Sequence, residues 1–156
     1  MAWQQSGDRQ QWTSLIKFLD QELITPVVTF SFYKKKCDGI AWGMRTMDLN
    51  TAQERNLASG FALQTQLRLS PQDSDLPQVQ TVCEMVRRGF GVHHGGLLLI
   101  LKEMIEILFS RNLIKVLFAT ETFAMGVNMP ARAVVFHSIC KHDGREFCCL
   151  EPGEYN

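Results

Sequence analysis

The sequence predicts an α/β fold in three layers, with a parallel β-sheet that carries helices on both faces. Three short apolar runs have the length and composition of buried strands, at residues 27–32, 116–119 and 133–136. A fourth short strand is predicted within residues 91–96, where it ends in a glycine loop. Amphipathic segments alternate with these runs, and such alternation is typical of βαβ units with parallel strands.

The composition of the chain excludes several classes of protein. Hydrophobic residues make up 46% and charged residues 21%, as in an ordinary globular domain. The formal net charge is +0, so nucleic-acid binding would have to depend on local sites. Five cysteines without a repeated spacing argue against a secreted disulfide framework. The sequence has neither a signal-peptide pattern nor an apolar stretch that could span a bilayer. We therefore expect an intracellular protein without a membrane partner, and these observations do not separate cytoplasm from nucleus.

The N-terminal part of the chain is predicted as helix, strand and helix. Residues 6–23 form an amphipathic helix, so that residues 1–24 lead into a domain over residues 25–156. The apolar face of this helix is expected to carry Trp12, Leu15, Ile16, Leu19 and Leu23. The strand at 27–32 is rich in β-branched and aromatic residues. A second helix should begin near Tyr33, and its buried stripe would be Ile40, Ala41 and Met44.

Two further amphipathic helices are predicted after a less regular region. Residues 50–69 are expected to be helical in pieces, and residues 70–77 have the composition of a loop. Residues 78–88 form a helix that Gly89 ends, with Val79, Val82, Cys83 and Val86 on one face. Residues 97–109 form a long apolar helix, and its inner face should hold Leu97, Leu98, Leu101, Met104, Ile105 and Leu108.

The segment 116–131 is the strongest candidate for a functional site. It begins as a buried strand, turns polar at Thr120 and Glu121, and continues through a helical turn to Gly126 and Asn128. Ligands of open α/β sheets bind outside the carboxyl ends of the strands, where these residues should lie. The side chain of Asn128 can form a hydrogen bond to such a ligand.

Two other strand ends carry polar residues. Lys34, Lys35 and Lys36 stand at the start of the second helix, where the helix dipole disfavours positive charge. A bound anion would relieve that cost, although the same lysines could simply form a solvated face. His93 and His94 should point to opposite faces of their strand. No further ligand stands near them at metal spacing, so we expect no metal site.

Three segments resemble, in the same order, motifs of the superkiller-type (Ski-like) RNA helicases of superfamily two. Residues 116–131 resemble helicase motif V over sixteen consecutive positions. Residues 91–96 are similar to the family's Gly-Val-His-His-(Ser/Ala)-Gly, with Gly95 in the place of Ser or Ala, a change that backbone contacts would survive. The resemblance to motif IV rests on Phe30, Ser31, Lys34, Cys37 and Asp38.

The resemblance implies a RecA-like fold and a set of site residues. The implied contacts to RNA are Ser31, Lys34, His94, Gly95, Thr120 and Glu121, and those to the nucleotide are Gly126 and Asn128. It also implies that the chain is the second of two RecA-like domains, with the nucleotide bound between it and the first. Such an enzyme would use ATP and Mg²⁺ to pull single-stranded RNA in the 3′ to 5′ direction for the RNA exosome and its cofactor subunits.

The motifs that hydrolyse ATP are missing from the sequence. It contains no Gly-x-x-x-x-Gly-Lys-(Ser/Thr) loop and no Asp-Glu pair. It stops at Asn156, just before the position where the family has its arginine-finger motif. We therefore expect a second domain truncated before that motif, without catalytic residues and inactive as an isolated chain. Two alternatives stay open: a non-catalytic module that binds RNA or a partner, and half of a DNA helicase, because contacts to phosphates do not read bases.

Overall fold

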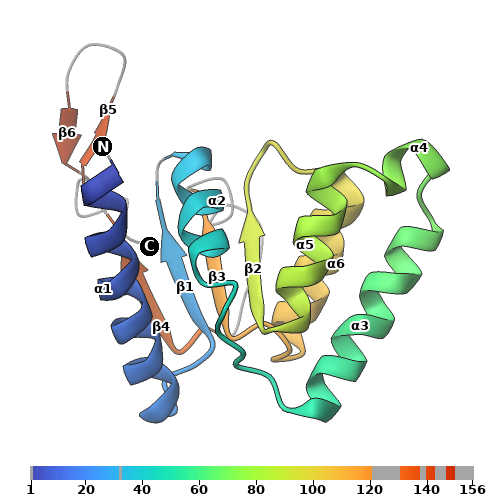
Figure 1. Cartoon of the computed structure of the whole chain (residues 1–156), viewed down its shortest axis with the longest axis horizontal. Helices are drawn as coiled ribbons and strands as arrows, with labels where there is room; N and C mark the ends of the chain where they lie inside the picture. The colour runs from blue at the N-terminus through green and yellow to red at the C-terminus, as the bar shows by residue number, and fades with distance from the viewer. Residues whose placement is uncertain (1, 32, 121–130, 138–139, 143–146, 150–156) are drawn as a thin grey trace.

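The predicted parallel sheet is confirmed by the computed structural model, which describes residues 2–31, 33–120, 131–137, 140–142 and 147–149. The sheet contains β1 (Val27–Phe30), β2 (Phe90–His93), β3 (Val116–Ala119) and β4 (Ala133–Phe136), in the order β2-β3-β1-β4 (Figure 1). Val27 is aligned with Val116 and Ala133, and Val116 is aligned with Phe90. All four strands therefore begin and end at the same level, and their carboxyl ends form one edge.

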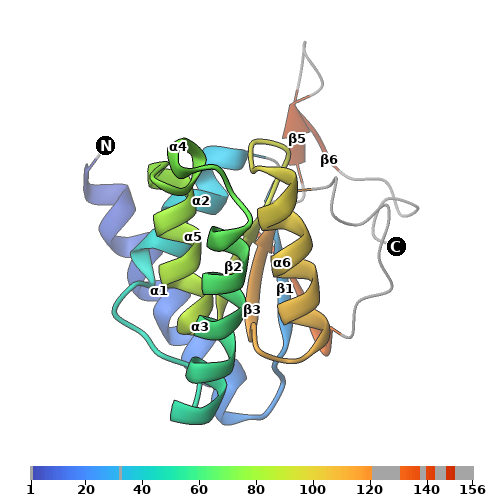
Figure 2. The ribbon, with the colours of Figure 1, turned by 90° about the vertical axis from the view of Figure 1, so that its right-hand side faces the viewer.

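Helices cover both faces of this sheet. They are α1 (Ala2–Gln21), α2 (Lys34–Gly43), α3 (Ala52–Leu67), the single turn α4 (Pro71–Ser74), α5 (Pro77–Arg87) and α6 (Leu99–Ser110). Figure 2 shows α1, α2 and α5 on one side of the strands and α6 on the other. The helix α3 packs against both α5 and α6 beyond β2, where it covers that end of the sheet. The arrangement is the three-layer α/β fold of RecA-like domains.

The two faces of the sheet are packed in different ways. On the α1 side, the Trp12 ring meets the Phe118 ring edge-on, with 6.0 Å between their centroids. On the α6 side, Gly91 allows close packing, because a Cβ atom there would lie 3.0 Å from the side chain of Leu117 and 3.4 Å from that of Ile105. The side chain of Ile105 is fully buried in this contact. A substitution at Gly91 would therefore push α6 away from β2.

Most of the predicted elements are confirmed, and three expectations about them are wrong. Leu23 was expected on the inner face of the first helix, but α1 ends at Gln21 and the Leu23 side chain is 74% exposed. Residues 50–69 hold one continuous helix, because the capping box of Thr51 and Glu54 starts α3 firmly. The expected loop at 70–77 contains the helical turn α4, which the Ser70 side chain caps.

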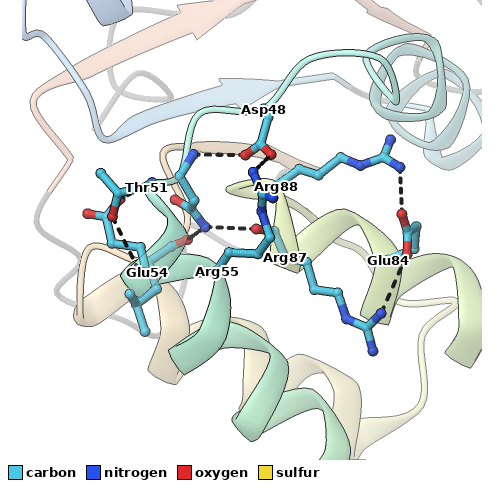
Figure 3. A network of polar contacts seen from close by, with 9 residues as sticks. Asp48, Thr51, Glu54, Arg55, Glu84, Arg87 and Arg88 are labelled. Carbon is cyan, nitrogen blue, oxygen red and sulfur yellow. Dashed lines mark hydrogen bonds and ion pairs between the residues drawn. The ribbon is translucent and has the colours of Figure 1, made fainter.

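A polar network holds the amino-terminal ends of β2 and β3 (Figure 3). The Asn50 amide donates to the carbonyl oxygens of Arg87, at 3.2 Å, and Leu113, at 3.0 Å. Next to it, Asp48 forms an ion pair with Arg55 of α3. The buried Lys115 ammonium donates to a carboxylate oxygen of Glu54 at 2.9 Å. These contacts stabilise the connection between α2 and α3 at the amino-terminal ends of the strands. This end of the sheet is opposite to the edge that the carboxyl ends form.

A second, separate pair of strands follows the main sheet. It consists of β5 (Cys140–His142) and β6 (Phe147–Cys149), which are antiparallel. Within the residues described, no helix has both the length and the apolar character that crossing a membrane requires.

Candidate nucleic-acid interface

The residues that directly follow three of the strands lie along one edge of the sheet. Ser31 follows β1 and donates its backbone N–H to the carbonyl oxygen of Ala119 at 2.9 Å. Thr120 follows β3 and donates its backbone N–H to the carbonyl oxygen of His93 at 3.2 Å. These two bonds extend the parallel pairing by one residue past the strands. The predicted site residues Ser31 and Thr120 are thus held rigidly beside the start of the glycine loop.

The helix α2 begins above this edge with three lysines. Its N-cap residue Tyr33 makes no side-chain hydrogen bond to the helix, and its first turn contains no acidic residue. Lys34, Lys35 and Lys36 are all exposed. Positive side chains here add to the partial positive charge of the helix N-terminus. The local potential therefore favours an anion, although the whole chain carries no net charge.

His94 connects the glycine loop to α2. Its Nδ1 atom accepts a hydrogen bond from the backbone N–H of Gly96 at 3.0 Å. Its Nε2 atom lies 2.9 Å from Oδ1 of Asp38. Because Nδ1 accepts, the proton of the neutral ring must be on Nε2, which donates to the Asp38 carboxylate. The ring is almost fully buried, so His94 positions the loop from below it.

The side chain of Lys34 lies over the same loop. A Cβ atom built on Gly95 would be 3.6 Å from Nζ of Lys34, and one built on Gly96 would be 3.7 Å from its Cδ atom. Gly95 is exposed, and its backbone N–H has no hydrogen-bond partner within the described part of the chain. The edge therefore places an ammonium group close to an exposed backbone amide. Ser31 and Thr120 lie below this surface, with 5% and 7% of their area exposed.

His93 points away from this edge, as its alternation with His94 predicted. Its Nε2 atom lies 2.9 Å from Oε1 of Glu106 on α6, on the opposite face of the sheet from Asp38. Burial lowers the pKa of His93 below its usual value, although its hydrogen bond and the charge of Glu106 act in the other direction. Among the residues whose positions are described, no three His, Cys, Asp or Glu side chains come together as a metal site.

Two supporting residues were not recognised from the sequence as parts of the site. The Gln78 side chain donates to the carbonyl oxygen of Gly96 at 2.9 Å and accepts from the backbone N–H of Leu98 at 3.1 Å. It thereby holds the loop between β2 and α6 from its far side. Asp38 was noted only as part of a motif pattern, and the structure identifies it as the partner of His94. No sequence signal could have found Gln78, because its role depends on the packing of α5.

Cys37 lies directly under the edge and serves as a packing residue. It is fully buried in the core beside Ser31. Burial raises the pKa of its thiol to about 11, and the negative charge of Asp38 adds to the effect. A thiol with so high a pKa is inert at neutral pH.

Five of the predicted site residues come together at this edge. They are Ser31, Lys34, His94, Gly95 and Thr120. The other three, Glu121, Gly126 and Asn128, lie outside the residues that the structure describes. Hydroxyl, ammonium and backbone N–H groups are the donors with which proteins bind phosphate oxygens. The edge is thus equipped to bind a phosphate group.

Comparisons with known proteins find relatives over nearly the whole chain. It is 53% identical to mouse superkiller complex protein 2 over 148 residues, which are 95% of this chain and 12% of the relative. It is 49% identical to human exosome RNA helicase MTR4 over 141 residues, 90% of this chain and 14% of the relative. It is 45% identical to the ATP-dependent RNA helicase mtr4 of Schizosaccharomyces pombe over 141 residues, 90% of this chain and 13% of the relative. No family model matches the chain. The chain therefore spans about an eighth of the length of these relatives.

Proposed function

We propose that this chain, which is homologous to a segment of the superkiller-type superfamily-two RNA helicases, supplies the second RecA-like motor domain of such an enzyme. The observation that carries this proposal is the convergence of Lys34, Gly95 and Thr120 on one edge of a RecA-like sheet. In this role the chain would serve an ATP-dependent RNA helicase that moves 3′ to 5′ along RNA. It would act in RNA unwinding and in decay by the RNA exosome.

The edge grips the sugar-phosphate backbone of single-stranded RNA. The Lys34 ammonium and the Gly95 backbone N–H face solvent and make the first contacts to a phosphate. The hydroxyl groups of Ser31 and Thr120 lie beneath them and contact the same backbone when it settles onto the edge. His94 keeps the glycine loop in place through Asp38 and Gly96. Glu121 completes the RNA side of the turn that follows β3.

The nucleotide lies on the other side of that turn. Gly126 and Asn128 contact ATP, which binds with Mg²⁺ between this domain and the first RecA-like domain of the intact helicase. A single turn that contacts both ligands couples the nucleotide state to the grip on RNA. The Asp-Glu pair and the phosphate loop have to come from the other domain, because this sequence contains neither. The expected partners are therefore that domain, single-stranded RNA and the exosome with its cofactor subunits.

Binding of RNA by the 156-residue chain tests the role of the edge. Fluorescence anisotropy with a labelled single-stranded RNA should show weaker binding for Lys34→Gln and for Thr120→Val, by about fivefold each, as expected for the loss of one net hydrogen bond. Lys17→Gln, an exposed lysine on α1 away from the edge, is the control for the change in charge. Equal losses in Lys17→Gln and Lys34→Gln would contradict a specific edge site.

Two further assays separate the alternatives. We expect no ATP hydrolysis above background by the chain alone, and RNA-stimulated turnover would contradict the proposed division of labour between two domains. A competition assay between single-stranded RNA and DNA of one sequence addresses the substrate. Preference for RNA supports the proposal, and equal affinity for both would favour a helicase that acts on DNA as well.

A further inference from the structure

A groove of about 730 Å³ lies between α1 and α2, on the side of the sheet away from α6. The residues of its lining that matter here are Arg9, Trp12, Lys35, Lys36, Trp42 and Arg45. The two helices approach each other closely at one end, where a Cβ atom on Gly43 would be 3.7 Å from Cγ of Arg9. The proposed function does not use this groove.

Basic side chains are concentrated in this groove. Arg9, Lys35, Lys36 and Arg45 line it, and no acidic side chain does among those described at residues 9–31, 33–120 and 131–137. Within the same residues, none of these four side chains forms an ion pair. The chain as a whole has equal numbers of basic and acidic residues, so this grouping is a local feature. Neighbouring charges of one sign repel each other, and an anionic occupant would remove that repulsion.

Trp42 gives the groove an exposed aromatic surface. This residue is 44% exposed. The Arg45 guanidinium lies 5.2 Å from the centre of the Trp42 ring and restrains its orientation. An indole ring held among cations is the combination with which proteins bind single-stranded nucleic acids, because bases stack on the ring while cations contact phosphates.

The groove is continuous with the phosphate-binding edge. Lys35 and Lys36 line the groove, and they directly follow Lys34 in the first turn of α2. Lys34 itself lies over Gly95 and Gly96 at the edge. A strand that leaves the edge can therefore pass over the start of α2 into the groove without leaving a positive surface. An acidic peptide would satisfy the charges but would leave both the stacking surface and this continuity unexplained.

We propose that the groove between α1 and α2 is a second binding site for single-stranded nucleic acid. Phosphates of the strand contact Arg9, Lys35, Lys36 and Arg45, and one base stacks on Trp42. The identification of the strand as RNA rests on the proposed function. The groove extends the RNA-binding surface of the domain beyond the edge. Long strands therefore bind more tightly than strands that contact the edge alone.

The experiment compares two double variants of the 156-residue chain. Arg9→Gln/Arg45→Gln removes two charges from the groove, and Arg68→Gln/Arg111→Gln removes two charges at the far side of the molecule. The control is closely matched, since Arg111 also lies over an aromatic ring, that of Phe61 at 4.9 Å. With an RNA of about 12 nucleotides, the groove variant should bind about tenfold more weakly and the control variant within twofold of the wild type. The slope of log affinity against log salt should fall by about 1.4 in the groove variant, as for two lost phosphate contacts.

A second pair of variants tests the stacking. Trp42→Ala should weaken binding of the same RNA by about fivefold, while Phe18→Ala, which removes another exposed aromatic residue, should leave it unchanged. Thermal unfolding of each variant shows whether it is folded. Equal losses in the groove and control variants, or no loss in Trp42→Ala, would overturn the proposal. So would a labelled poly-glutamate peptide whose binding the groove variants abolish while RNA binding persists, because the occupant would then be a protein.

The results also separate this inference from the proposed function. Loss of RNA binding in Lys34→Gln and Thr120→Val, with none in the groove variants, overturns the groove and leaves the edge intact. The reverse pattern supports the groove and contradicts the role of the edge.

Discussion

At the scale of single residues, the two glycines of the loop after β2 have different constraints. A Cβ atom on Gly95 would meet Lys34 at an ordinary contact distance of 3.6 Å. A Cβ atom on Gly96 would come within 3.1 Å of the buried ring of His94, which has no space to move. This difference agrees with the resemblance, in which Gly95 occupies a position where the family has Ser or Ala. The glycine that the loop requires is Gly96.

A pair of substitutions tests this difference. Gly95→Ala should keep RNA affinity within twofold and should not lower the free energy of unfolding, since alanine reduces the entropy of the unfolded chain. Gly96→Ala should lower the free energy of unfolding by about 1–2 kcal/mol and weaken RNA binding, because it displaces His94 from Asp38. Urea unfolding and anisotropy measure the two effects. Equal behaviour of the two variants would show that His94 does not fix the loop.

The buried His93 makes stability depend on pH. Burial lowers the pKa of His93 in the folded chain below the usual value of 6.5, which applies to the unfolded chain. At a pH between the folded and the unfolded pKa, the unfolded chain therefore binds more protons than the folded one. The free energy of unfolding should therefore be highest above about pH 6.5 and decrease as the pH falls through that value. Urea unfolding at a series of pH values from 8 to 5 would measure this slope. His93→Gln should flatten it, and an unchanged slope would assign the effect to another group.

At the scale of the elements, the strands were the easiest part of the fold to predict. A strand such as β3 is buried on both faces, so all four of its residues are apolar. Such a short apolar run can be recognised in the sequence without knowing which strands lie beside it. The buried faces of α5 and α6 were predicted for the same reason, since a regular apolar spacing has only one possible orientation toward a sheet. The positive φ angle of Gly89, +88°, likewise agrees with its predicted place at the end of α5.

The continuity of α3 and the positioning of the site residues were not predicted. The helix α3 has exposed apolar residues, Leu57, Leu63 and Leu67. Because these residues interrupt the regular apolar spacing, the sequence predicted several short helical pieces where the structure has one helix. At the candidate site, the types of residue that follow the strands were visible in the sequence. Their positioning by Gln78 and Asp38 was not, because these side chains come from helices that are distant in the chain.

The network beneath the sheet makes a prediction about Asn50. Its side chain satisfies two carbonyl oxygens, those of Arg87 and Leu113, which connect α5 and the loop before β3. Asn50→Ala should lower the free energy of unfolding by about 2–3 kcal/mol, because one buried and one partly buried carbonyl group lose their partner. Asn56→Ala, at an exposed position on α3, is the control and should change it by less than about 0.5 kcal/mol. A small effect at Asn50 would mean that water replaces its side chain.

At the scale of the whole molecule, the proposed function makes this chain the second of two RecA-like domains. It has a RecA-like sheet, an edge suited to phosphates and 53% identity to mouse superkiller complex protein 2, of which it covers 12%. The proposed assignment accounts for an edge suited to anions in a sequence that contains neither the phosphate loop nor the Asp-Glu pair.

A chimera tests this central claim most directly. The 141-residue segment of human exosome RNA helicase MTR4 that matches this chain would be replaced by the corresponding residues of the chain, and RNA-stimulated ATP hydrolysis measured. The account predicts a folded chimera that keeps RNA-stimulated hydrolysis within about tenfold of the parent, and a further loss when Lys34→Gln and Thr120→Val are added. A folded chimera that binds RNA and ATP but shows no stimulated hydrolysis would contradict the assignment of this chain as a helicase motor domain.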